Sequence, residues 1–278
     1  MISRSHLSLA SSNSAPRPAD TPVFILCGGL GTRLREETEF RPKPMVPIGD
    51  QPILVHIMRW YAKFGFKRFI LCAGYRSEVI RQYFANFHAL NDDFTVDLAA
   101  NSIEIHPTCR QPGWRVTVAY TGELTMTGAR LRQAASRYLD DAETFAVTYG
   151  DGLTDADLRA ELEDHHNVGR LGTVLGVNPP ARFGEFRFEG DHLTSFAEKP
   201  ERHDSWINGG FFFFERAFLS YLGNSDDCIL EQEPLTRLAG NGELHVHKHG
   251  GYWACMDTLR DRMHLNDVWA RGEAPWAA

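Results

Sequence analysis

Apolar and polar residues follow two different periods along the chain from residue 22 onward. The runs 23–27 and 68–73 are continuously apolar, which is typical of strands buried on both faces of a sheet. The stretch 52–64 instead has an apolar residue at about every fourth position, which indicates an amphipathic helix. Pro52 and Gly65 are typical start and stop residues for that helix.

The same two patterns recur through the rest of the chain. We expect further strands at 114–120, 144–148, 171–177 and 211–214, and further helices around 79–87 and at 128–139, 156–166 and 258–269. This alternation predicts an α/β protein whose mostly parallel mixed sheet is flanked by helices on both faces. In such sheets ligands bind outside the carboxyl ends of the strands, so the first strand-to-helix loop is where we expect the site.

The N-terminal residues 1–20 differ from the rest of the chain. They are rich in Ser, Ala and Pro and lack the apolar segment of a signal peptide, so we expect a disordered tail. Residues 21–278 show no internal repeat or linker and predict a single domain. Within it, residues 89–113 lack a clean period and are interpreted as an inserted loop or hairpin used for assembly.

Composition narrows the class of function. The 278 residues include 29 basic and 36 acidic side chains, a net charge of −7, which disfavours a general nucleic-acid binder. No apolar run is long enough to predict a membrane span. The five cysteines are scattered without a CxxC pair, which disfavours a disulfide framework or a zinc site and is typical of the cytoplasm.

The loop after the first strand reads GGLGTR, from Gly28 to Arg33. Its glycines let backbone N–H groups approach a ligand, and Arg33 adds a positive charge, so a triphosphate is the expected guest. No GK[ST] follows, as a P-loop requires, and Leu34 stands where the dinucleotide fingerprint needs its third glycine. A plain glycine turn is the alternative. Lys43 between two prolines favours the phosphate site, because the stiff segment would hold its charge in place.

These motifs, with others downstream, lead to a known family. GGLGTRL and PKPMVPIGDQPIL, followed by Gly150-Asp151-Gly152, Glu198-Lys199-Pro200, Asn208-Gly209-Gly210 and Met256-Asp257-Thr258, resemble the signature of the sugar-1-phosphate nucleotidyltransferases. The resemblance covers almost all of residues 22–276 and implies a Rossmann-like nucleotidyltransferase fold. Its finer cues are Glu36-Glu37-Thr38, Met126–Arg130, Glu231–Leu235 and Gly272–Trp276, which look most like the members that use CTP and glucose 1-phosphate.

The resemblance also implies roles for particular residues. Nucleotide binding is expected at Leu26, Gly28, Gly29, Leu30, Gly31, Thr32, Arg33, Lys43, Thr127, Gly128, Arg130 and Asp151. Sugar-phosphate binding is expected at Glu198, Lys199, Asn208 and Gly209. Catalytic roles are expected for Arg33, Lys43 and Asp151, and Asp151 with Asp257 is expected to hold Mg²⁺. A homo-oligomer, trimer or hexamer, is also implied.

Several of these residues have ordinary alternatives. Asp257 precedes an expected helix and could be its N-cap, and Arg130 could be an exposed residue rather than a donor to O2 and N3 of cytosine. His245, His247 and His249 would share one strand face, where three ligands converge poorly on a metal. Cys27 stands where many members of the family carry Ala, and could make the protein sensitive to thiol reagents.

The reaction implied is transfer of CMP from CTP to glucose 1-phosphate, giving CDP-glucose and pyrophosphate. The sugar phosphate is already an anionic nucleophile, so it attacks the α-phosphorus in line without a covalent intermediate. Mg²⁺ with Arg33, Lys43 and Lys199 would offset the repulsion between the two polyanions. Two alternatives stay open: the same chemistry with UTP, dTTP or another sugar phosphate, and a non-catalytic subunit that senses nucleotide sugars.

Overall fold

The structure is a computed structural model that describes residues 15–107, 113–179, 185–197 and 205–277. Among these residues, a central sheet of seven strands has the order β14-β10-β13-β8-β1-β4-β7. Its strands are β1 (Val23–Cys27), β4 (Arg68–Ala73), β7 (Arg115–Tyr120), β8 (Thr144–Tyr149), β10 (Gly172–Val177), β13 (Ile207–Glu215) and β14 (Leu244–His249). The expected α/β class with a mixed, mostly parallel sheet is confirmed.

The middle of the sheet explains the continuous apolar runs. All five residues of β1 are buried, because β1 pairs in parallel with both β4 and β8 and helices cover both faces. The pairs β4–β7 and β10–β14 are also parallel. Strand β13 runs antiparallel to β8 and β10, a reversal that its uniform phenylalanine run did not indicate.

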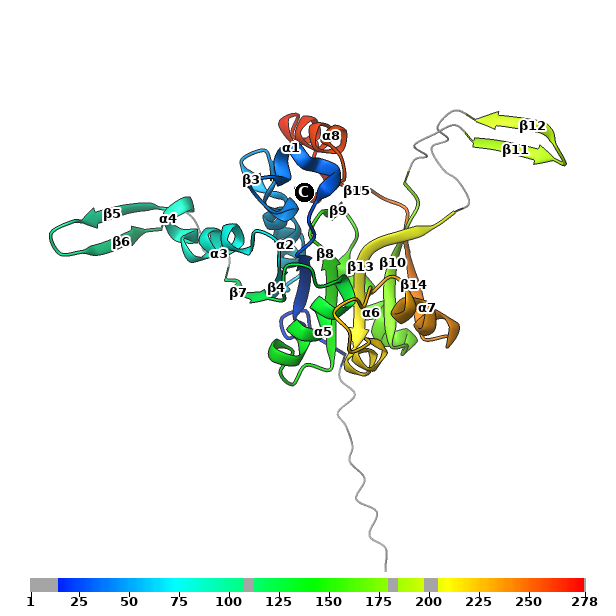
Figure 1. Cartoon of the computed structure of the whole chain (residues 1–278), viewed down its shortest axis with the longest axis horizontal. Coiled ribbons are helices and arrows are strands. Elements are labelled where there is room, and N and C mark those ends of the chain that lie inside the picture. Colours follow the sequence, from blue (N-terminus) through cyan, green and yellow to red (C-terminus); the bar gives the residue numbers. More distant parts are fainter. Residues whose placement is uncertain (1–14, 108–112, 180–184, 198–204, 278) are drawn as a thin grey trace, which may run out of the picture.

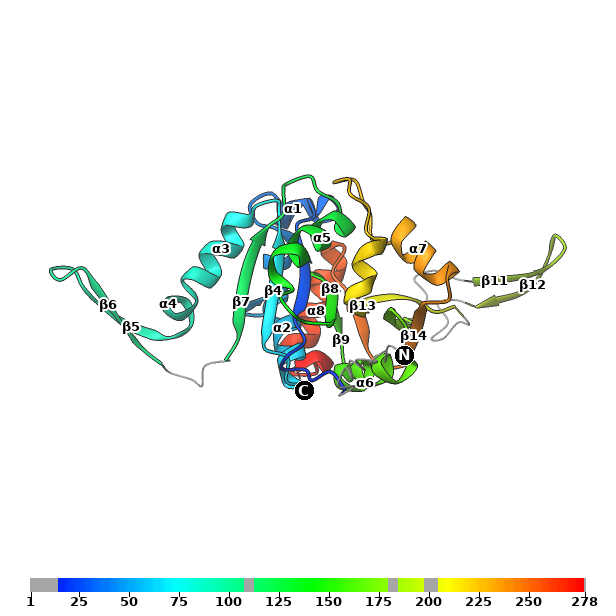
Figure 2. The same cartoon turned by 90° about the horizontal axis from the view of Figure 1, so that it is seen from below.

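Helices lie on both faces of the sheet (Figure 1, Figure 2), and a hydrophobic layer packs between the sheet and the helices on each face. One layer joins alternate β1 residues such as Ile25 to α2, α6 and α8, and the other joins residues such as Phe24 to α5 and α7. The helices are α1 (Arg35–Thr38), α2 (Ile53–Lys63), α3 (Ser77–Ala85), α4 (Phe87–Asn91), α5 (Thr127–Tyr138), α6 (Leu158–Val168), α7 (Glu233–Gly240) and α8 (Leu259–Ala270). The 3₁₀ turns are η1 (Thr32–Leu34), η2 (Lys43–Met45), η3 (Arg216–Tyr221) and η4 (Pro275–Ala277).

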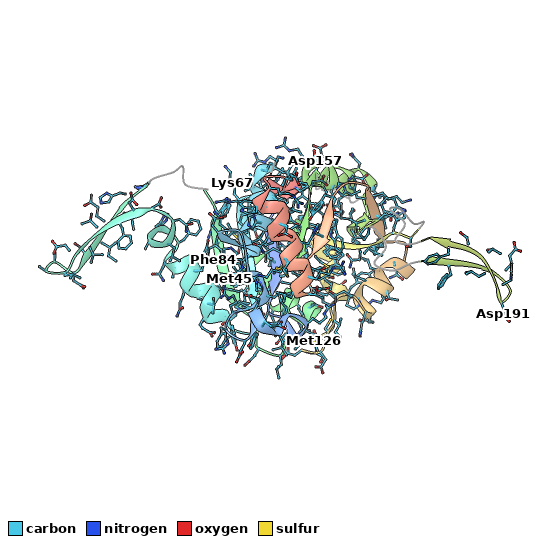
Figure 3. All side chains as sticks on the ribbon, turned by 90° about the horizontal axis from the view of Figure 1, so that it is seen from above. Met45, Lys67, Phe84, Met126, Asp157 and Asp191 are labelled. Atoms are coloured by element: carbon cyan, nitrogen blue, oxygen red, sulfur yellow. The ribbon has the colours of Figure 1, made fainter. Side chains whose placement is uncertain are left out.

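Two hairpins project from opposite sides of this body (Figure 1, Figure 2). The first, β5 (Asp93–Asp97) with β6 (Ser102–His106), lies in the segment expected to be an insertion. The second, β11 (Glu185–Glu189) with β12 (His192–Ala197), has Asp191 in its turn and was not expected from the sequence (Figure 3).

A small antiparallel pair carries two segments to the carboxyl edge of the sheet. Strand β9 (Gly152–Thr154) pairs with β15 (Trp253–Cys255), so that Gly152 lies opposite Cys255. The backbone N–H of Met256 donates to the carbonyl of Asp151 at 2.9 Å. This pairing brings together two segments that lie about 100 residues apart in the sequence. The remaining pair is β2 (Pro47–Ile48) with β3 (Gln51–Pro52).

The disordered tail expected at residues 1–20 lies largely outside the described residues, which begin at residue 15. Residues 17–20 form a turn, in which the N–H of Asp20 donates to the carbonyl of Arg17 at 3.0 Å. No helix in the described ranges is long and apolar enough to cross a membrane.

Candidate active site

A cleft of about 500 Å³ opens at the carboxyl edge of the central sheet. Thirteen of the residues expected to bind nucleotide, sugar phosphate or metal line it: Leu26, Gly28, Gly29, Gly31, Thr32, Arg33, Lys43, Thr127, Arg130, Asp151, Asn208, Gly209 and Asp257. Leu30 and Gly128 do not line the cleft. Leu30 is 45% exposed, and Gly128 packs closely against Cys228. Glu198 and Lys199 lie outside the described residues. The cleft therefore gathers most of the expected site in one place.

The glycines at the start of the loop after β1 differ in what surrounds them. A Cβ on Gly28 would lie 2.2 Å from the guanidinium carbon of Arg130, whereas a Cβ on Gly29 would meet nothing within 4 Å. Gly31 has a φ of +64°, a conformation that favours glycine, and its carbonyl accepts a hydrogen bond from Thr38 at 3.0 Å. The need for glycine at position 28 therefore comes from a protein side chain, in addition to any ligand.

Lys43 lies between two carboxylates at the floor of the cleft. Its Nζ donates to Oδ2 of Asp151 and to Oδ1 of Asp257, both at 2.6 Å. Arg33 adds a third cationic contact, from Nη1 to Oδ2 of Asp257 at 2.9 Å. Pro42 and Pro44 flank Lys43 in η2, so its backbone is held while its side chain reaches both strand ends. The structure thus joins all four residues in one ionic cluster.

Lys43 and Asp257 keep their charges at neutral pH. Burial by itself would lower the pKa of Lys43, but Asp151 and Asp257 outweigh this effect and the pKa is raised. Burial would raise the pKa of Asp257, but Lys43 and then Arg33 outweigh it and the pKa is lowered. Both groups therefore stay ionised across the physiological range.

The two carboxylates fit a magnesium ion that also binds phosphate. They already converge on one cation, the Lys43 ammonium, at 2.6 Å each. Within the described parts of the chain, no group of three or more His, Cys, Asp or Glu side chains could hold a metal ion by itself. Mg²⁺ commonly takes one or two carboxylates and fills its other positions with water and substrate phosphate. Asp151 and Asp257 match that pattern.

The alternative role of Asp257 as a helix N-cap is wrong. The N-cap of α8 is Thr258, whose hydroxyl accepts from the backbone N–H of Asp261 at 3.2 Å. The Asp261 carboxylate in turn accepts from the N–H of Thr258 at 2.8 Å, which completes a capping box. Because Thr258 satisfies the helix end, the Asp257 side chain is free to face the cleft.

Arg130 is buried, so the alternative in which it is an exposed surface residue is wrong. Its side chain lies at the base of the cleft, and only 3% of the residue is exposed. Nη1 donates to the hydroxyl of Thr121 and the carbonyl of Gly122, and Nη2 donates to the carbonyls of Gly28 and Glu123, at 2.6–2.9 Å. A bond from these nitrogens to cytosine would have to share or replace one of the four, and that role stays a prediction.

Two further residues of the site were missed by sequence reasoning. Tyr149 ends β8 and lines the cleft, and its hydroxyl donates to Oε1 of Glu231 at 2.5 Å. The hydroxyl of Thr127 donates to Oε2 of the same carboxylate at 2.8 Å. The position of Tyr149, directly before the Gly150-Asp151 motif, was a usable signal. Glu231 belongs to the Glu231–Leu235 cue of the resemblance, but that cue gave it no role in the site and did not indicate this contact.

The cysteine expectation fails for Cys27. The residue has no exposed surface, and burial, followed by the nearby Cys72 thiol, raises the pKa of its thiol well above the ordinary value. A protonated, inaccessible thiol is a poor nucleophile, so Cys27 does not give the folded protein thiol sensitivity. Cys27 and Cys255 both line the cleft, but Cys27 has no exposed surface, whereas Cys255 is partly exposed, with its Sγ 3.7 Å from Oδ2 of Asp257.

The three histidines of β14 share one face, as expected from their alternation. His245 and His247 both contact Oδ2 of Asp164 on α6, at 3.0 and 2.8 Å. His249 contacts Oδ1 of Asp155 at 2.6 Å. These pairs tie the edge strand to α6 and to the segment after β9, which accounts for the histidines without a metal.

The family described as nucleotidyl transferase matches residues 23–257. The chain belongs to this family. It is 46% identical to a glucose-1-phosphate cytidylyltransferase of Salmonella typhi, over 91% of this chain and 98% of the relative. A probable glucose-1-phosphate cytidylyltransferase of Bacillus subtilis is 38% identical over the same shares of the two chains. The family resemblance drawn from the motifs is thereby confirmed.

Solved structures support the same fold. A putative glucose-1-phosphate thymidylyltransferase from Bacillus anthracis has a TM-score of 0.65 at 19% identity, over 89% of this chain and 94% of that one. HddC from Yersinia pseudotuberculosis also has a TM-score of 0.65, at 22% identity, over 90% of this chain and 99% of that one. At these identities the likeness shows the nucleotidyltransferase fold of the Rossmann-like type.

Proposed function

We propose that this chain is a glucose-1-phosphate cytidylyltransferase, which converts CTP and glucose 1-phosphate to CDP-glucose and pyrophosphate. The observation that carries the proposal is the ionic cluster of Lys43 with Asp151 and Asp257, joined at 2.6 Å in the cleft. The 46% identity to a relative of that name, over 98% of the relative's length, supports the choice of nucleotide and sugar.

The residues that line the cleft fit a direct displacement. An oxygen of the sugar phosphate attacks the α-phosphorus of CTP in line, the bond from that phosphorus to the bridging oxygen breaks, and pyrophosphate leaves. No covalent intermediate is needed, because the nucleophile is already an anion. The main obstacle is repulsion between the two polyanions, so catalysis depends on alignment and on local positive charge.

Arg33 and Lys43 supply that charge in different ways. The side chain of Arg33 is 72% exposed and bonded to one carboxylate, so it can turn toward a phosphate with little loss. The Lys43 ammonium carries three donors and uses two on Asp151 and Asp257, which leaves one for a phosphate oxygen. We place pyrophosphate stabilisation on this pair.

Asp151 and Asp257 are the residues we propose as ligands of Mg²⁺. The ion, when bound, supplies charge neutralisation at the phosphates. The sugar side of the cleft would be formed by Asn208 and Gly209 at the start of β13, and the expected roles of Glu198 and Lys199 remain part of the proposal.

We also propose that the chain assembles with further copies of itself, as a trimer or hexamer. The first hairpin carries Phe94, Val96 and Ile103 on one face, with 47%, 43% and 65% of each exposed. A two-stranded hairpin is marginally stable alone, and an apolar face of this kind is typical of an interface. Light scattering on the intact chain and on Ile103→Asp tests this: a trimer or hexamer that the substitution disrupts supports it, and a monomeric intact chain contradicts it.

The function is tested by pyrophosphate release with Mg²⁺ and glucose 1-phosphate, offering CTP, UTP, dTTP, ATP and GTP separately. Release with CTP alone supports the proposal. Release with another nucleotide keeps the chemistry but overturns the choice of base. No release with any nucleotide overturns the enzyme assignment for this sugar phosphate, and a CTP-binding titration then separates a sensing subunit, which binds without turnover, from an enzyme for another sugar.

A further inference from the structure

Tyr149 and Glu231 form a hydrogen-bonded link across the wall of the cleft. At one end of the link is Thr127, which faces the expected nucleotide side, and at the other is Asn208, which faces the expected sugar side. The Glu231 carboxylate accepts from Thr127 at 2.8 Å and from Tyr149 at 2.5 Å. The side-chain amide of Asn208 then reaches the Tyr149 hydroxyl at 3.5 Å. Four side chains from four separate segments thus connect the two halves.

Each end of this link is fixed by the backbone around it. The Thr127 hydroxyl accepts from the N–H of Leu230 at 2.9 Å while it donates to Glu231, so its direction is determined. The Asn208 carbonyl oxygen accepts from the N–H of Gly210 at 2.8 Å, which turns its amide nitrogen toward Tyr149. Neither end can rotate without losing a second hydrogen bond.

The Tyr149 ring is held in place by a close approach to β13. A Cβ on Gly210, whose φ is +80°, would lie 2.4 Å from the ring, so glycine is required there for the ring to fit. The ring also packs edge-to-face on Phe212 with centroids 6.0 Å apart. Burial, and then the Glu231 carboxylate, raises the pKa of the Tyr149 hydroxyl, so it keeps its proton and acts as the donor to Glu231.

The loop that carries Glu231 is docked on the first turn of α5. The carbonyl of Asp226 accepts from the N–H of Met126 at 2.9 Å, and the carbonyl of Cys228 accepts from the N–H of Ala129 at 3.1 Å. A Cβ on Gly128 would lie 2.7 Å from the Cys228 sulfur, so the glycine permits this contact. These contacts join the loop that carries Glu231 to the first turn of α5 at several points, so a shift of that turn would carry Glu231 with it.

We infer that Tyr149 and Glu231 are positioning residues that couple nucleotide binding to sugar-phosphate binding. Glu231 does not line the cleft, so it acts through Thr127 and Tyr149 rather than on substrate. A nucleotide seated against Thr127 orders the carboxylate, and the carboxylate in turn sets Tyr149 and Asn208 for the sugar. This inference rests on the proposed function, since it assigns the two ends of the link to CTP and glucose 1-phosphate.

The test measures glucose 1-phosphate affinity by calorimetry, with and without a CTP analogue whose α–β bridge is methylene, in the presence of Mg²⁺. We expect the analogue to tighten sugar-phosphate binding at least about 5-fold in the intact chain, the lower end of usual coupling between sites. Tyr149→Phe removes the donor, and Glu231→Gln leaves one acceptor oxygen for two hydroxyls. In both variants the enhancement should fall below about 2-fold.

The matched control is Glu233→Gln, because Glu233 is near Glu231 in sequence but bonds Arg237 on the exposed side of α7, at 2.6 Å. It should keep the full enhancement, and the double variant of Tyr149 and Glu231 should lose no more than either single one. Equal enhancement in all proteins, or none in the intact chain, overturns the coupling. A fall in Tm with an unchanged enhancement also overturns it, since that result indicates a structural role alone.

Pyrophosphate release by the intact chain is measured in parallel and separates the two proposals. Turnover of CTP with an unchanged enhancement in the variants means that only the coupling fails. Turnover of another nucleotide means that the choice of base fails, and the coupling is then judged with the methylene analogue of that nucleotide. If the chain binds neither substrate, both proposals are overturned.

Discussion

The two ends of the cleft use arginine in opposite ways, and they are named the phosphate end and the base end after the proposed position of the nucleotide. Arg33, at the phosphate end, has a side chain that is 72% exposed and makes one ion pair. Arg130, at the base end, is 3% exposed and donates four hydrogen bonds to neutral oxygens of the loop after β1 and the segment 121–123. One arginine is available to a ligand, and the other forms part of the frame that shapes the loop.

This difference indicates at which end of the cleft ion pairs can exchange partners when a ligand binds. At the phosphate end, Lys43, Asp151 and Asp257 neutralise one another and can exchange partners when phosphates arrive. At the base end, the buried guanidinium of Arg130 has no carboxylate partner among the described residues and depends on its four acceptors, because an unsatisfied buried charge is costly. The phosphate end is therefore expected to determine the rate, and the base end to determine stability and loop shape.

The largest effect is expected from the carboxylates of the phosphate end. Asp151→Asn and Asp257→Asn should each lower kcat by at least about 100-fold, because each removes charge that holds Mg²⁺ and Lys43. Asp191→Asn, in the turn of the second hairpin, is the matched control and should keep full turnover. Pyrophosphate release measures the effect and circular dichroism checks the fold. Unchanged turnover in both variants would contradict the assigned roles.

The next effect concerns the two arginines directly. Arg130→Lys should lower the free energy of unfolding by about 3 kcal/mol, because lysine cannot reach four acceptors spread over the loop after β1 and the segment 121–123. Arg33→Lys should change it by no more than about 0.5 kcal/mol, as is usual at an exposed position. Urea unfolding measures both. Equal costs at the two positions would show that the ends of the cleft do not differ as described.

A smaller effect separates two adjacent glycines. Gly28→Ala should destabilise by about 1–3 kcal/mol, because the new methyl would lie 2.2 Å from the Arg130 guanidinium. Gly29→Ala meets nothing within 4 Å and should leave the free energy of unfolding nearly unchanged. Thermal unfolding of the pair checks this, and a Gly29 variant as unstable as the Gly28 variant would refute the packing explanation.

The smallest expected effect is a difference between the two ends of the cleft in how stability depends on pH. The pKa of Asp257 in the folded chain lies below its ordinary value of 3.8, because Lys43 and Arg33 outweigh its burial. Its stabilising contribution is therefore complete above that value and is lost as pH falls through the folded pKa. The Tm difference between Asp257→Asn and the intact chain should shrink below about pH 4. The Tm decrease caused by Arg130→Lys should persist over the same pH range. A difference for Asp257→Asn that is constant down to pH 3 would be evidence against this ionic role.

Much of the fold could be read from hydrophobic periods, because they record burial directly. The run of five apolar residues corresponds to β1, and the apolar residues at about every fourth position correspond to α2. The direction of β13 could not be read, since strand direction depends on connections. The hairpin β11–β12 could not be read either, since its apolar residues Phe186, Leu193 and Phe196 are exposed rather than part of the core. The gathering of Lys43, Asp151 and Asp257 was implied by family motifs rather than by any local pattern.

The sequence by itself determined the class of fold, the glycine loop, the stiff segment around Lys43 and the family, because each is written in short contiguous patterns. Only the tertiary structure decided that Arg130 is a buried frame residue, that Thr258 rather than Asp257 caps α8, and that Glu231 joins Thr127 to Tyr149. Which donor meets which acceptor depends on segments about 100 residues apart arriving at one edge of the sheet. That outcome is set by packing of the whole core and leaves no local trace in the chain.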